Sequence, residues 1–484
     1  MFNKTVLVVA YYFPPIAASG SMRPLGFCRY LDRYGWRPRV LTTEPKSVYP
    51  PTGVDESLCG QVPNSIQIDR VPHKNPEQTL LQVRNRVRGA MTRLLSSGGT
   101  QPLTNANGHT LDGPQVGFRE QYLNLKTALL DWLFSFPDPQ CFWLRPAVER
   151  FSRIPRDEYP DAVFATGGPW TTLLVGKALA KRFQVPFVAD LRDPWTCNPY
   201  IQVRSPFLFR RAAQLERSVY EAAACVIANT AELRVKLLID HPDLENKFIT
   251  ITNGFDGGTY NPAANEGRVR QSPGVSVKPP IELCHFGSVY GNRNPLLFLQ
   301  AVKELIDEKR IGPDRLRIRF TGAWEVTETS CENLAQELEQ LGIVRREPSV
   351  PHNECVQLMM VAEILLILQP ASPLQIPGKI YEYIATGRPL LVIGGEGATA
   401  QLVERHQLGA FCRNEIADIK TMLARIVNGH MRITPPPKEE LAGFEYRTLT
   451  ADLASVLDAV CAAKQIMRSV DRRASGPDYP PPPL

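Results

Sequence analysis

Neither paired cysteines nor a long apolar run occurs in this chain of 484 residues. Its ten cysteines stand singly, with no C-x-x-C pair and no Cys/His cluster at zinc spacing, so we expect reduced thiols and no metal site. No run of about 20 apolar residues is present, so the sequence predicts no membrane-spanning helix. The net charge of +6 is mild and no RNA- or DNA-binding signature accompanies it, so nucleic acid is not an expected partner.

The N-terminal stretch "MFNKTVLVVAYYF" is apolar, but it is too short to cross a membrane and leads directly into a turn. This pattern is typical of a first strand rather than of a signal peptide. We therefore expect a cytoplasmic protein, either free or peripheral on the cytoplasmic face of a membrane.

Short β-branched runs alternate with helical patterns, which is typical of parallel sheets covered by helices. The chain is too long for one ordinary core, so two such α/β domains are expected. In the first half, strands are predicted at 5–13, 37–43, 161–168, 185–191, 224–230 and 248–254, with helices at 170–182 and 206–223. In the second half, strands are predicted at 281–288, 316–322, 363–370, 388–395 and 408–413, and a last helix near 447–465.

Domain boundaries follow from changes in composition. Residues 1–255 form the first domain, and residues 256–280 are a linker, because glycine, proline and polar residues follow one another there without a period. The second domain spans 281–430 and a helical segment spans 431–468. The tail at 469–484 ends in "PDYPPPPL" and is too rich in proline to fold.

One segment, residues 74–118, fits neither sheet. It contains the basic amphipathic stretch "EQTLLQVRNRVRGAMTRLL", in which Leu80 and Val83 share a helical face while Arg84 and Arg88 lie largely off it. Two interpretations stay open. The helix packs on its own domain, or it rests on an anionic membrane, where each basic residue adds about 1 kcal/mol.

Ligands of open parallel sheets bind beyond the carboxyl ends of the strands, so candidate site residues are sought there. The first strand leads into "FPPIAASGSMRP", in which a loop of small residues runs from Pro14 to Gly20 and is followed by Arg23. Ser21 can cap a helix running to Gly35, which would turn backbone N–H groups near Gly20 towards an anion. The loop lacks a G-x-G-x-x-G fingerprint, and a purely structural turn is the alternative.

A second candidate, "VADLRDPW", follows another predicted strand. Asp190 and Asp193 flank Arg192 and are three residues apart, so both carboxylates can face one pocket in a turn. A salt bridge satisfied within this segment is the alternative. Asp193 lies outside the apolar run, where a carboxylate can reach substrate hydroxyls.

The third candidate, "HFGSVYGNRNP", opens the second domain. A strand leads into a loop with Gly287 and Arg293, and Asn294-Pro295 then begins a helix. A cation at a helix entrance above a sheet suits a phosphate, and an exposed loop arginine is the alternative.

The fourth candidate, "LQIPGKIYEYIATGRPLLVIGG", combines a short helix with the next strand. Lys379 and Glu382 are three residues apart and therefore neighbours on one helical face. A carboxylate here can accept both hydroxyls of a ribose. As a mere surface pair, the two residues would contribute less than about 1 kcal/mol.

These motifs, in this order, resemble those of the family 4 glycosyltransferases over nearly the whole chain. The resemblance is carried by the opening loop and by "ATGGPW", "DLRDPW", "ANTAEL", "ITNGFD", "FGSVYGNRNP" and "KIYEYIATGRPLLVI". It implies the GT-B fold: α/β, with two Rossmann-like doubly wound parallel-sheet domains facing across a cleft. In that family the N-terminal domain holds the acceptor and the C-terminal domain holds a nucleotide sugar.

Carried over by position, the resemblance implies that the Gly20 backbone approaches the donor diphosphate, that Arg293 grips it and that Glu382 binds the ribose. The family's arginine after the strand-end glycine is Ser288 here, next to Gly287, and we hypothesise that Lys379 replaces it.

Two further departures concern acidic residues. The first glutamate of the family's E-x7-E pattern falls at Leu374, and a frequent His-Asp pair reads Arg192-Asp193. The identity of the catalytic group is therefore left open by the sequence.

The resemblance thus implies a glycosyltransferase that moves a sugar from a nucleotide sugar to an acceptor hydroxyl, with retention and without a metal or other cofactor. Asp193, Arg293 and Lys379 are the expected catalytic residues, while Gly20, Arg23, Asp190, Arg192, Gly287, Ser288 and Glu382 are expected to bind substrate. The implied acceptor is a carbohydrate or a lipid-linked sugar of surface polysaccharide or glycolipid synthesis. A non-catalytic nucleotide-sugar-binding partner protein and a sugar-nucleotide epimerase are the alternatives.

Overall fold

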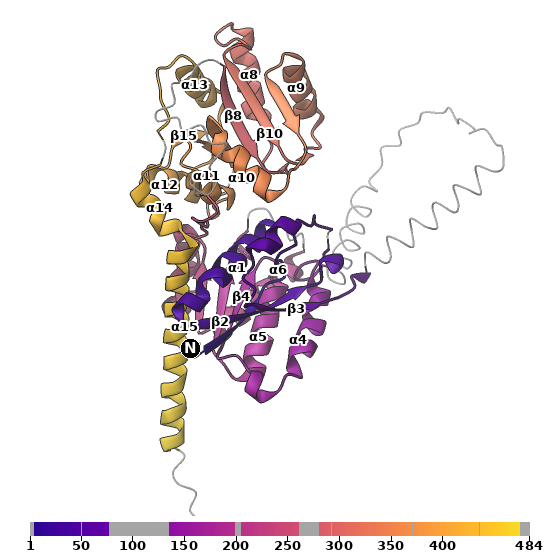
Figure 1. The fold of residues 1–484 in the computed structure, drawn as a ribbon, viewed down its shortest axis with the longest axis vertical. Coiled ribbons are helices and arrows are strands. Elements are labelled where there is room, and N and C mark those ends of the chain that lie inside the picture. The colour runs from indigo at the N-terminus through magenta and orange to yellow at the C-terminus, as the bar shows by residue number, and fades with distance from the viewer. Residues whose placement is uncertain are drawn as a thin grey trace, which may run out of the picture.

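The computed structural model describes residues 4–49, 51–76, 135–198, 205–260, 280–291, 293–369, 372–434 and 436–474. Two parallel α/β sheets, one in each half of the chain, form the body of the molecule (Figure 1). Most of the segment predicted at 74–118, most of the predicted linker and the last ten residues of the predicted tail lie outside the described residues.

The N-terminal half contains a parallel sheet of seven described strands in the order β3-β2-β1-β4-β5-β6-β7. The strands span Lys4–Val9 (β1), Trp36–Thr43 (β2), Gln67–Val71 (β3), Ala162–Gly167 (β4), Phe187–Leu191 (β5), Cys225–Ala228 (β6) and Phe248–Thr250 (β7). The predicted strands of this half are confirmed. The sequence prediction misses β3, because this edge strand is only partly buried and gives no continuous apolar run.

Helices cover both faces of this sheet. They span Ser19–Tyr30 (α1), Leu144–Ser152 (α4), Thr171–Phe183 (α5), Pro206–Ala222 (α6) and Ala231–Asp240 (α7). Short 3-10 helices span Leu31–Tyr34 (η1), Pro45–Ser47 (η2), Glu56–Gln61 (η3), Cys141–Trp143 (η4), Arg156–Glu158 (η5) and Pro242–Lys247 (η6). On the face opposite α1, the buried side chains of α4, α5, α6 and α7 share one apolar core with those of β1.

The start of α1 differs from the prediction. The helix begins at Ser19 after Ala18, and Ser21 lies inside its first turn with its hydroxyl donating to the Ile16 carbonyl at 2.6 Å. Ser21 is therefore not the cap. The helix ends at Tyr30, and a 3-10 turn carries the chain on to Gly35, whose φ of 82° closes it.

The C-terminal half contains a second parallel sheet, of six described strands in the order β12-β10-β8-β13-β14-β15. The strands span Ile281–Phe286 (β8), Leu316–Thr321 (β10), Val344–Glu347 (β12), Ile364–Gln369 (β13), Leu390–Gly394 (β14) and Ala410–Arg413 (β15). Val289–Tyr290 (β9) and Trp324–Glu325 (β11) form a separate two-stranded ribbon. The predicted strands are confirmed, and the polar "VRRE" of β12 explains why it was missed.

The helices of this half span Leu296–Asp307 (α8), Thr329–Gln340 (α9), His352–Val361 (α10), Lys379–Ala385 (α11), Ala398–Arg405 (α12), Ile416–Val427 (α13) and Lys438–Leu441 (α14), followed by the 3-10 turn Ala442–Phe444 (η8). The last helix, Tyr446–Ala474 (α15), leaves this half and lies along the N-terminal half beside α1 (Figure 1). Its Leu453 and Leu457 are buried against β1 and α1. Within the described part of the chain, no helix is long and apolar enough to cross a membrane.

The chain crosses between the halves twice, and the two crossings are bonded to each other. Phe255 N–H donates to the Phe444 carbonyl at 3.0 Å, and Tyr446 N–H donates to the Phe255 carbonyl at 2.8 Å. Gly254 allows this approach, because a Cβ there would overlap the Phe444 carbonyl oxygen. The "NGFD" motif is therefore the point where both connections meet.

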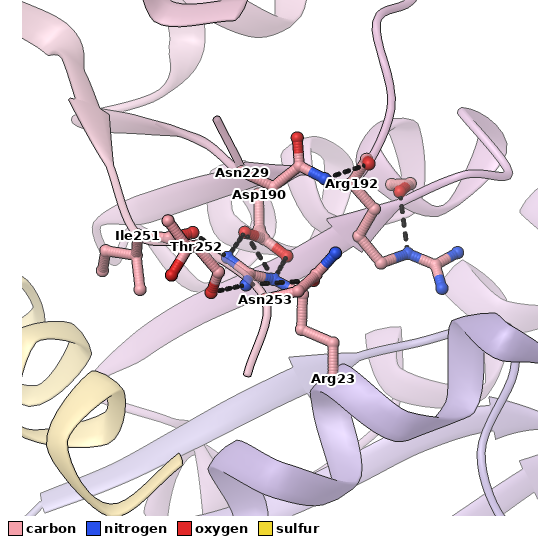
Figure 2. Close-up of polar contacts among 8 residues, drawn as sticks. Arg23, Asp190, Arg192, Asn229, Ile251, Thr252 and Asn253 are labelled. Atoms are coloured by element: carbon pink, nitrogen blue, oxygen red, sulfur yellow. Dashed lines mark hydrogen bonds and ion pairs between the residues drawn. The ribbon is translucent and has the colours of Figure 1, made fainter. Parts of the chain in front are cut away.

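A buried ion pair lies beneath this crossing (Figure 2). The Arg23 side chain is 2% exposed, and its guanidinium contacts Asp190 with Nε–Oδ2 and Nη2–Oδ1 distances of 2.9 and 2.7 Å. Nη2 also donates to the Ile251 carbonyl at 2.8 Å, while Nη1 donates to the Thr252 carbonyl and to Asn253 Oδ1. Burial acts against the cation, but Asp190 outweighs it and holds the pKa of Arg23 above its ordinary value.

These contacts give Arg23 and Asp190, which were expected to bind substrate, a structural role; Arg23 also lines a cleft between the two halves. Every nitrogen of the Arg23 guanidinium already donates to a protein acceptor, and Asp190 is fully buried. The pair therefore joins α1, β5 and the segment that follows β7. Asp190 therefore pairs with Arg23, and not with Arg192 as the alternative interpretation of this segment required.

We predict that Arg23→Met destabilises the N-terminal half by about 3–5 kcal/mol, because Asp190 is left buried without a cation. Urea unfolding followed by tryptophan fluorescence measures the loss. Arg145→Met is the matched control, since Arg145 pairs with Glu149 on the surface of α4. Similar midpoints for both variants would show that the buried pair does not stabilise the fold.

Candidate functional site

The order of strands reverses at the centre of each sheet, between β1 and β4 in the first and between β8 and β13 in the second. At such positions the crossovers leave the sheet in opposite directions and open a crevice at the carboxyl ends of the strands. In the second sheet the pairing of β8 with β13 is limited to Leu283–Ile364 and Cys284–Leu365, so the strands diverge beyond these pairs. His285 is held at this divergence, with Nδ1 3.0 Å from the Leu366 carbonyl oxygen.

A cleft of about 860 Å³ lies between the two halves and is lined by residues of both. It brings together most of the predicted site residues. Arg23, Arg192 and Asp193 line it from the N-terminal half. The C-terminal half contributes Gly287, Ser288, Arg293, Lys379 and Glu382.

Gly20 does not line this cleft, although its backbone was expected to approach the ligand. It is buried, and a Cβ at this position would overlap the Arg192 guanidinium. Ser21 N–H, which was also expected to face the ligand, donates to the Ala18 carbonyl at 2.9 Å. Because Gly20 has no side chain, the Arg192 guanidinium can pack against the backbone at this position.

Arg192 presents a positive charge to the cleft. Its Nε donates to the Gly167 carbonyl at 3.0 Å, while its terminal nitrogens have no hydrogen-bond partner among the described residues (Figure 2). Gly168, with φ of 94°, lies against the same guanidinium. Burial lowers the pKa of Arg192, against the opposing effect of Asp193 and Asp190, so an anion in the cleft would stabilise its charge.

Asp193 is the neighbouring carboxylate on the same wall. Burial raises its pKa above the ordinary value, although Arg192, Gln375 and Arg293 act in the opposite direction. Gln375 Nε2 donates to Asp193 Oδ1 at 2.6 Å, and this bond joins the two halves. Asp193 is thus a partly buried carboxylate whose ionised form depends on its neighbours.

On the opposite wall, Lys379 and Glu382 form an ion pair at the start of α11, with Nζ 3.3 Å from Oε2. Burial opposes the ionised carboxylate, but Lys379 and His352 outweigh it and lower the pKa of Glu382 to about 2. For Lys379 burial acts against the cation, and Glu382 nevertheless raises its pKa above the ordinary value. Both groups are therefore charged at neutral pH.

Arg293 and Gly287 complete this wall. The Arg293 guanidinium lies over the Tyr290 ring, 5.4 Å from its centroid, and it forms no ion pair with the residues that the structure describes. Gly287 has a φ of 129° and lies beside the Lys379 side chain. Lys379, at the start of α11, therefore lies beside the loop after β8 that carries Arg293, and both cations line the cleft.

The sequence prediction did not name several polar residues of the cleft, and His352 and Gln375 are the two that contact its predicted carboxylates. His352 begins α10, where its N–H donates to Asp55 Oδ2 at 2.8 Å and its Nε2 lies 3.5 Å from Glu382 Oε1. It follows β12, and because that strand was missed, the strand-end rule was not applied there. The signal for Gln375 was its position directly after Leu374, where the family's first glutamate is absent.

Leu374 itself is turned away from the cleft. Its side chain packs against the core of the N-terminal half, and its carbonyl accepts a hydrogen bond from Thr230 Oγ1 at 2.7 Å. The family resemblance implies a carboxylate near the sugar at position 374. In this protein Leu374 instead forms a contact between the two halves. Asp193 and Asp55 are carboxylates of the N-terminal half that line the cleft, and Asp55 already accepts hydrogen bonds from the Ser57 and His352 N–H groups.

The charges of the cleft suit a ligand with both anionic and hydroxyl groups. Arg192, Arg293 and Lys379 favour an anion bound between the halves, while Asp193 and Glu382 can accept hydrogen bonds from hydroxyls. In the described part of the chain, no group of three or more His, Cys, Asp or Glu side chains is placed to hold a metal ion.

Comparison with known sequences shows what part of the chain is similar to. Residues 21–239 match the family described as Glycosyl transferase 4-like domain. The D-inositol 3-phosphate glycosyltransferase of Kineococcus radiotolerans is 25% identical over 209 residues, which make up 41% of this chain and 46% of that protein. The match thus spans about half the length of this curated relative.

Solved structures resemble the whole fold. Anabaena HepE in complex with UDP and glucose is 16% identical, with a TM-score of 0.53 over 97% of this chain and 100% of that one. Sucrose-phosphate synthase from Thermosynechococcus elongatus is 13% identical, with a TM-score of 0.53 over 98% of this chain and 99% of that one. Residues 21–239 therefore resemble the glycosyl transferase 4-like domain, and the chain as a whole has the GT-B fold of two Rossmann-like sheets facing across a cleft.

Proposed function

We propose that the protein is a glycosyltransferase that moves a sugar from a nucleoside-diphosphate sugar to an acceptor hydroxyl, with retention of configuration and without a metal. The observation that carries this proposal is the cleft at the carboxyl ends of both sheets, where Arg192, Arg293 and Lys379 come together from opposite walls. A pyrophosphate is the ligand that needs such a set of cations in the absence of a metal. The family that residues 21–239 match supports the same reaction class.

The donor binds mainly to the C-terminal half. Arg293 and Lys379 hold the diphosphate, and Arg192 reaches it from the opposite wall. This makes Arg192, together with Lys379, a replacement for the cation that is absent at Ser288. Glu382 accepts the ribose hydroxyls, because its carboxylate lines the cleft and is ionised at neutral pH, with Lys379 Nζ 3.3 Å from Oε2 as its counter-charge.

In the reaction, the bond between the anomeric carbon and the phosphate oxygen breaks, and its electron pair passes to the nucleoside diphosphate. A bond from the acceptor oxygen forms at the same face of the sugar. The acceptor proton is taken up by the leaving diphosphate, which lies on that face. The cations stabilise the negative charge that grows on the diphosphate, and they do so without reorganisation because the fold has already positioned them.

The acceptor binds on the N-terminal wall, where Asp193 orients its hydroxyl. A carbohydrate or lipid-linked acceptor of surface polysaccharide or glycolipid synthesis fits a cytoplasmic enzyme of this family, working free or at an anionic membrane surface. UDP-glucose is the first donor to test, because HepE binds UDP and glucose in a similar fold. A thermal-shift screen against UDP, GDP and ADP sugars identifies the donor, since ligand binding to the folded state raises the Tm.

We predict that Arg293→Ala lowers kcat/KM for sugar transfer by about 100-fold or more, because one donor of hydrogen bonds to the leaving group is lost. The assay is run in EDTA, as the proposal requires no metal. Arg310→Ala is the matched control, since Arg310 is an exposed arginine of the same half that lies outside the cleft. Unchanged turnover in Arg293→Ala, at an unchanged Tm, would remove the phosphate role of Arg293.

A second prediction concerns the ribose. Glu382→Gln should weaken the binding of the free nucleoside diphosphate by roughly 10-fold, because a charged acceptor of hydrogen bonds becomes a neutral one. Calorimetry measures the Kd, with Glu354→Gln, an exposed glutamate of α10, as the control.

The pH dependence of this affinity gives a further check on Glu382. Because its pKa is lowered to about 2, the carboxylate stays ionised when the pH falls from 8 to 5, and it contributes no loss of affinity in that range. Wild-type affinity in Glu382→Gln would count against the ribose role.

A further inference from the structure

A single side chain of the C-terminal half reaches the carboxylate that faces it on the N-terminal wall. Gln375 Nε2 donates to Asp193 Oδ1 at 2.6 Å, and both residues line the cleft. The bond occupies one oxygen of Asp193. The other, Oδ2, carries no hydrogen bond from the described residues and is open to a ligand.

Gln375 is held in this orientation by its own surroundings. Its Oε1 accepts a hydrogen bond from Ser372 Oγ at 2.9 Å, and its backbone carbonyl accepts one from Thr399 Oγ1 at 3.1 Å. An ionised carboxylate can only accept hydrogen bonds, so the amide nitrogen must face Asp193. The side chain is therefore a fixed donor before any ligand arrives.

The charged groups that act on Asp193 come from both walls. Arg192 precedes it on the same loop and Arg293 faces it from the loop after β8, while burial favours the neutral acid. The donor hydrogen bond from Gln375 adds to the two arginines in favouring the ionised form. Without Gln375, the balance shifts towards the protonated acid.

The Gln375–Asp193 bond is not needed merely to hold the two halves together. The same segment is already tied to the N-terminal half one residue earlier, through Thr230 Oγ1 and the Leu374 carbonyl and through the packing of the Leu374 side chain. The Gln375 bond lies instead inside the cleft and uses a carboxylate that remains half open to it. The Gln375–Asp193 hydrogen bond would break if the two halves moved apart, because a hydrogen bond requires donor and acceptor within about 3.2 Å.

We propose that Gln375 is a positioning residue, supplied by the donor-binding half, that fixes the Asp193 carboxylate and keeps it ionised so that its second oxygen can orient the acceptor hydroxyl. This assignment rests on the proposed glycosyl transfer. It couples the two halves, because the group that orients the acceptor is complete only when the donor-binding half is in place. The segment around Leu374, which lacks the family's first glutamate, would thus act on the acceptor through Gln375 and Asp193.

The test compares Gln375→Met, which keeps the length of the side chain and removes the donor, with Thr230→Val, which removes the neighbouring bond between the halves without touching Asp193. The measurement is the pH profile of kcat/KM for sugar transfer. In Gln375→Met the pKa of Asp193 rises, so activity is lost at a higher pH as the solution is acidified. We expect the midpoint of the acid limb to move up by about 1 pH unit, equivalent to about 10-fold lower kcat/KM on the acid side.

Thr230→Val should lower the Tm, because Thr230 also caps α7, but it should leave the acid limb where it is in the wild type. An acid limb that stays in place in Gln375→Met, or that moves equally in Thr230→Val, would overturn the positioning role.

A second measurement does not depend on catalysis. The Tm losses of Asp193→Ala, Gln375→Met and the double variant form a cycle, and we expect the double variant to lose less than the sum of the single losses. Additive losses would show that the bond does not exist in solution. If the wild type transfers no sugar from any donor, the proposed function fails and the positioning role fails with it, even where the cycle is non-additive.

Discussion

A buried guanidinium, that of Arg23, holds together three segments of the N-terminal half that border the cleft. It joins α1 to the end of β5 through Asp190 and to the segment after β7 through the carbonyls of Ile251 and Thr252. Because an uncompensated charge is costly in the interior, these segments are not free to separate. The loop that begins two residues after Asp190 is therefore presented to the cleft from a fixed base (Figure 2).

The charged residues of the N-terminal wall are positioned by the segments that the Arg23–Asp190 pair holds in place. Arg192 and Asp193 emerge from the end of β5, and Gly20 and Gly168 leave room for the arginine to lie flat against α1 and the loop after β4. The opposite wall brings Lys379 and Glu382 on one turn of α11. Each half alone offers only part of the proposed diphosphate site, so the relation of the halves, set by their two bonded crossings, matters as much as the residues themselves.

Sequence patterns predicted most strands of both sheets and several residues that line the cleft. Strands buried on both faces read as continuous apolar runs, and the rule that ligands bind at strand ends pointed to Arg192, Arg293 and Glu382. Edge strands such as β3 gave no such run, because one side of them is partly exposed. The partner of Arg23 could not be read from the sequence, since 167 residues separate it from Asp190. The contact of Gln375 with Asp193 depends on the packing of the two halves, which no local pattern encodes.

The central claim is that one diphosphate is held between cations of both halves. A crystal structure of the protein with bound UDP tests it most directly. The account predicts phosphate oxygens within hydrogen-bond distance of Arg293, Lys379 and Arg192, with the ribose hydroxyls on Glu382. A nucleotide bound outside the cleft, or phosphates that touch none of these three cations, would contradict it.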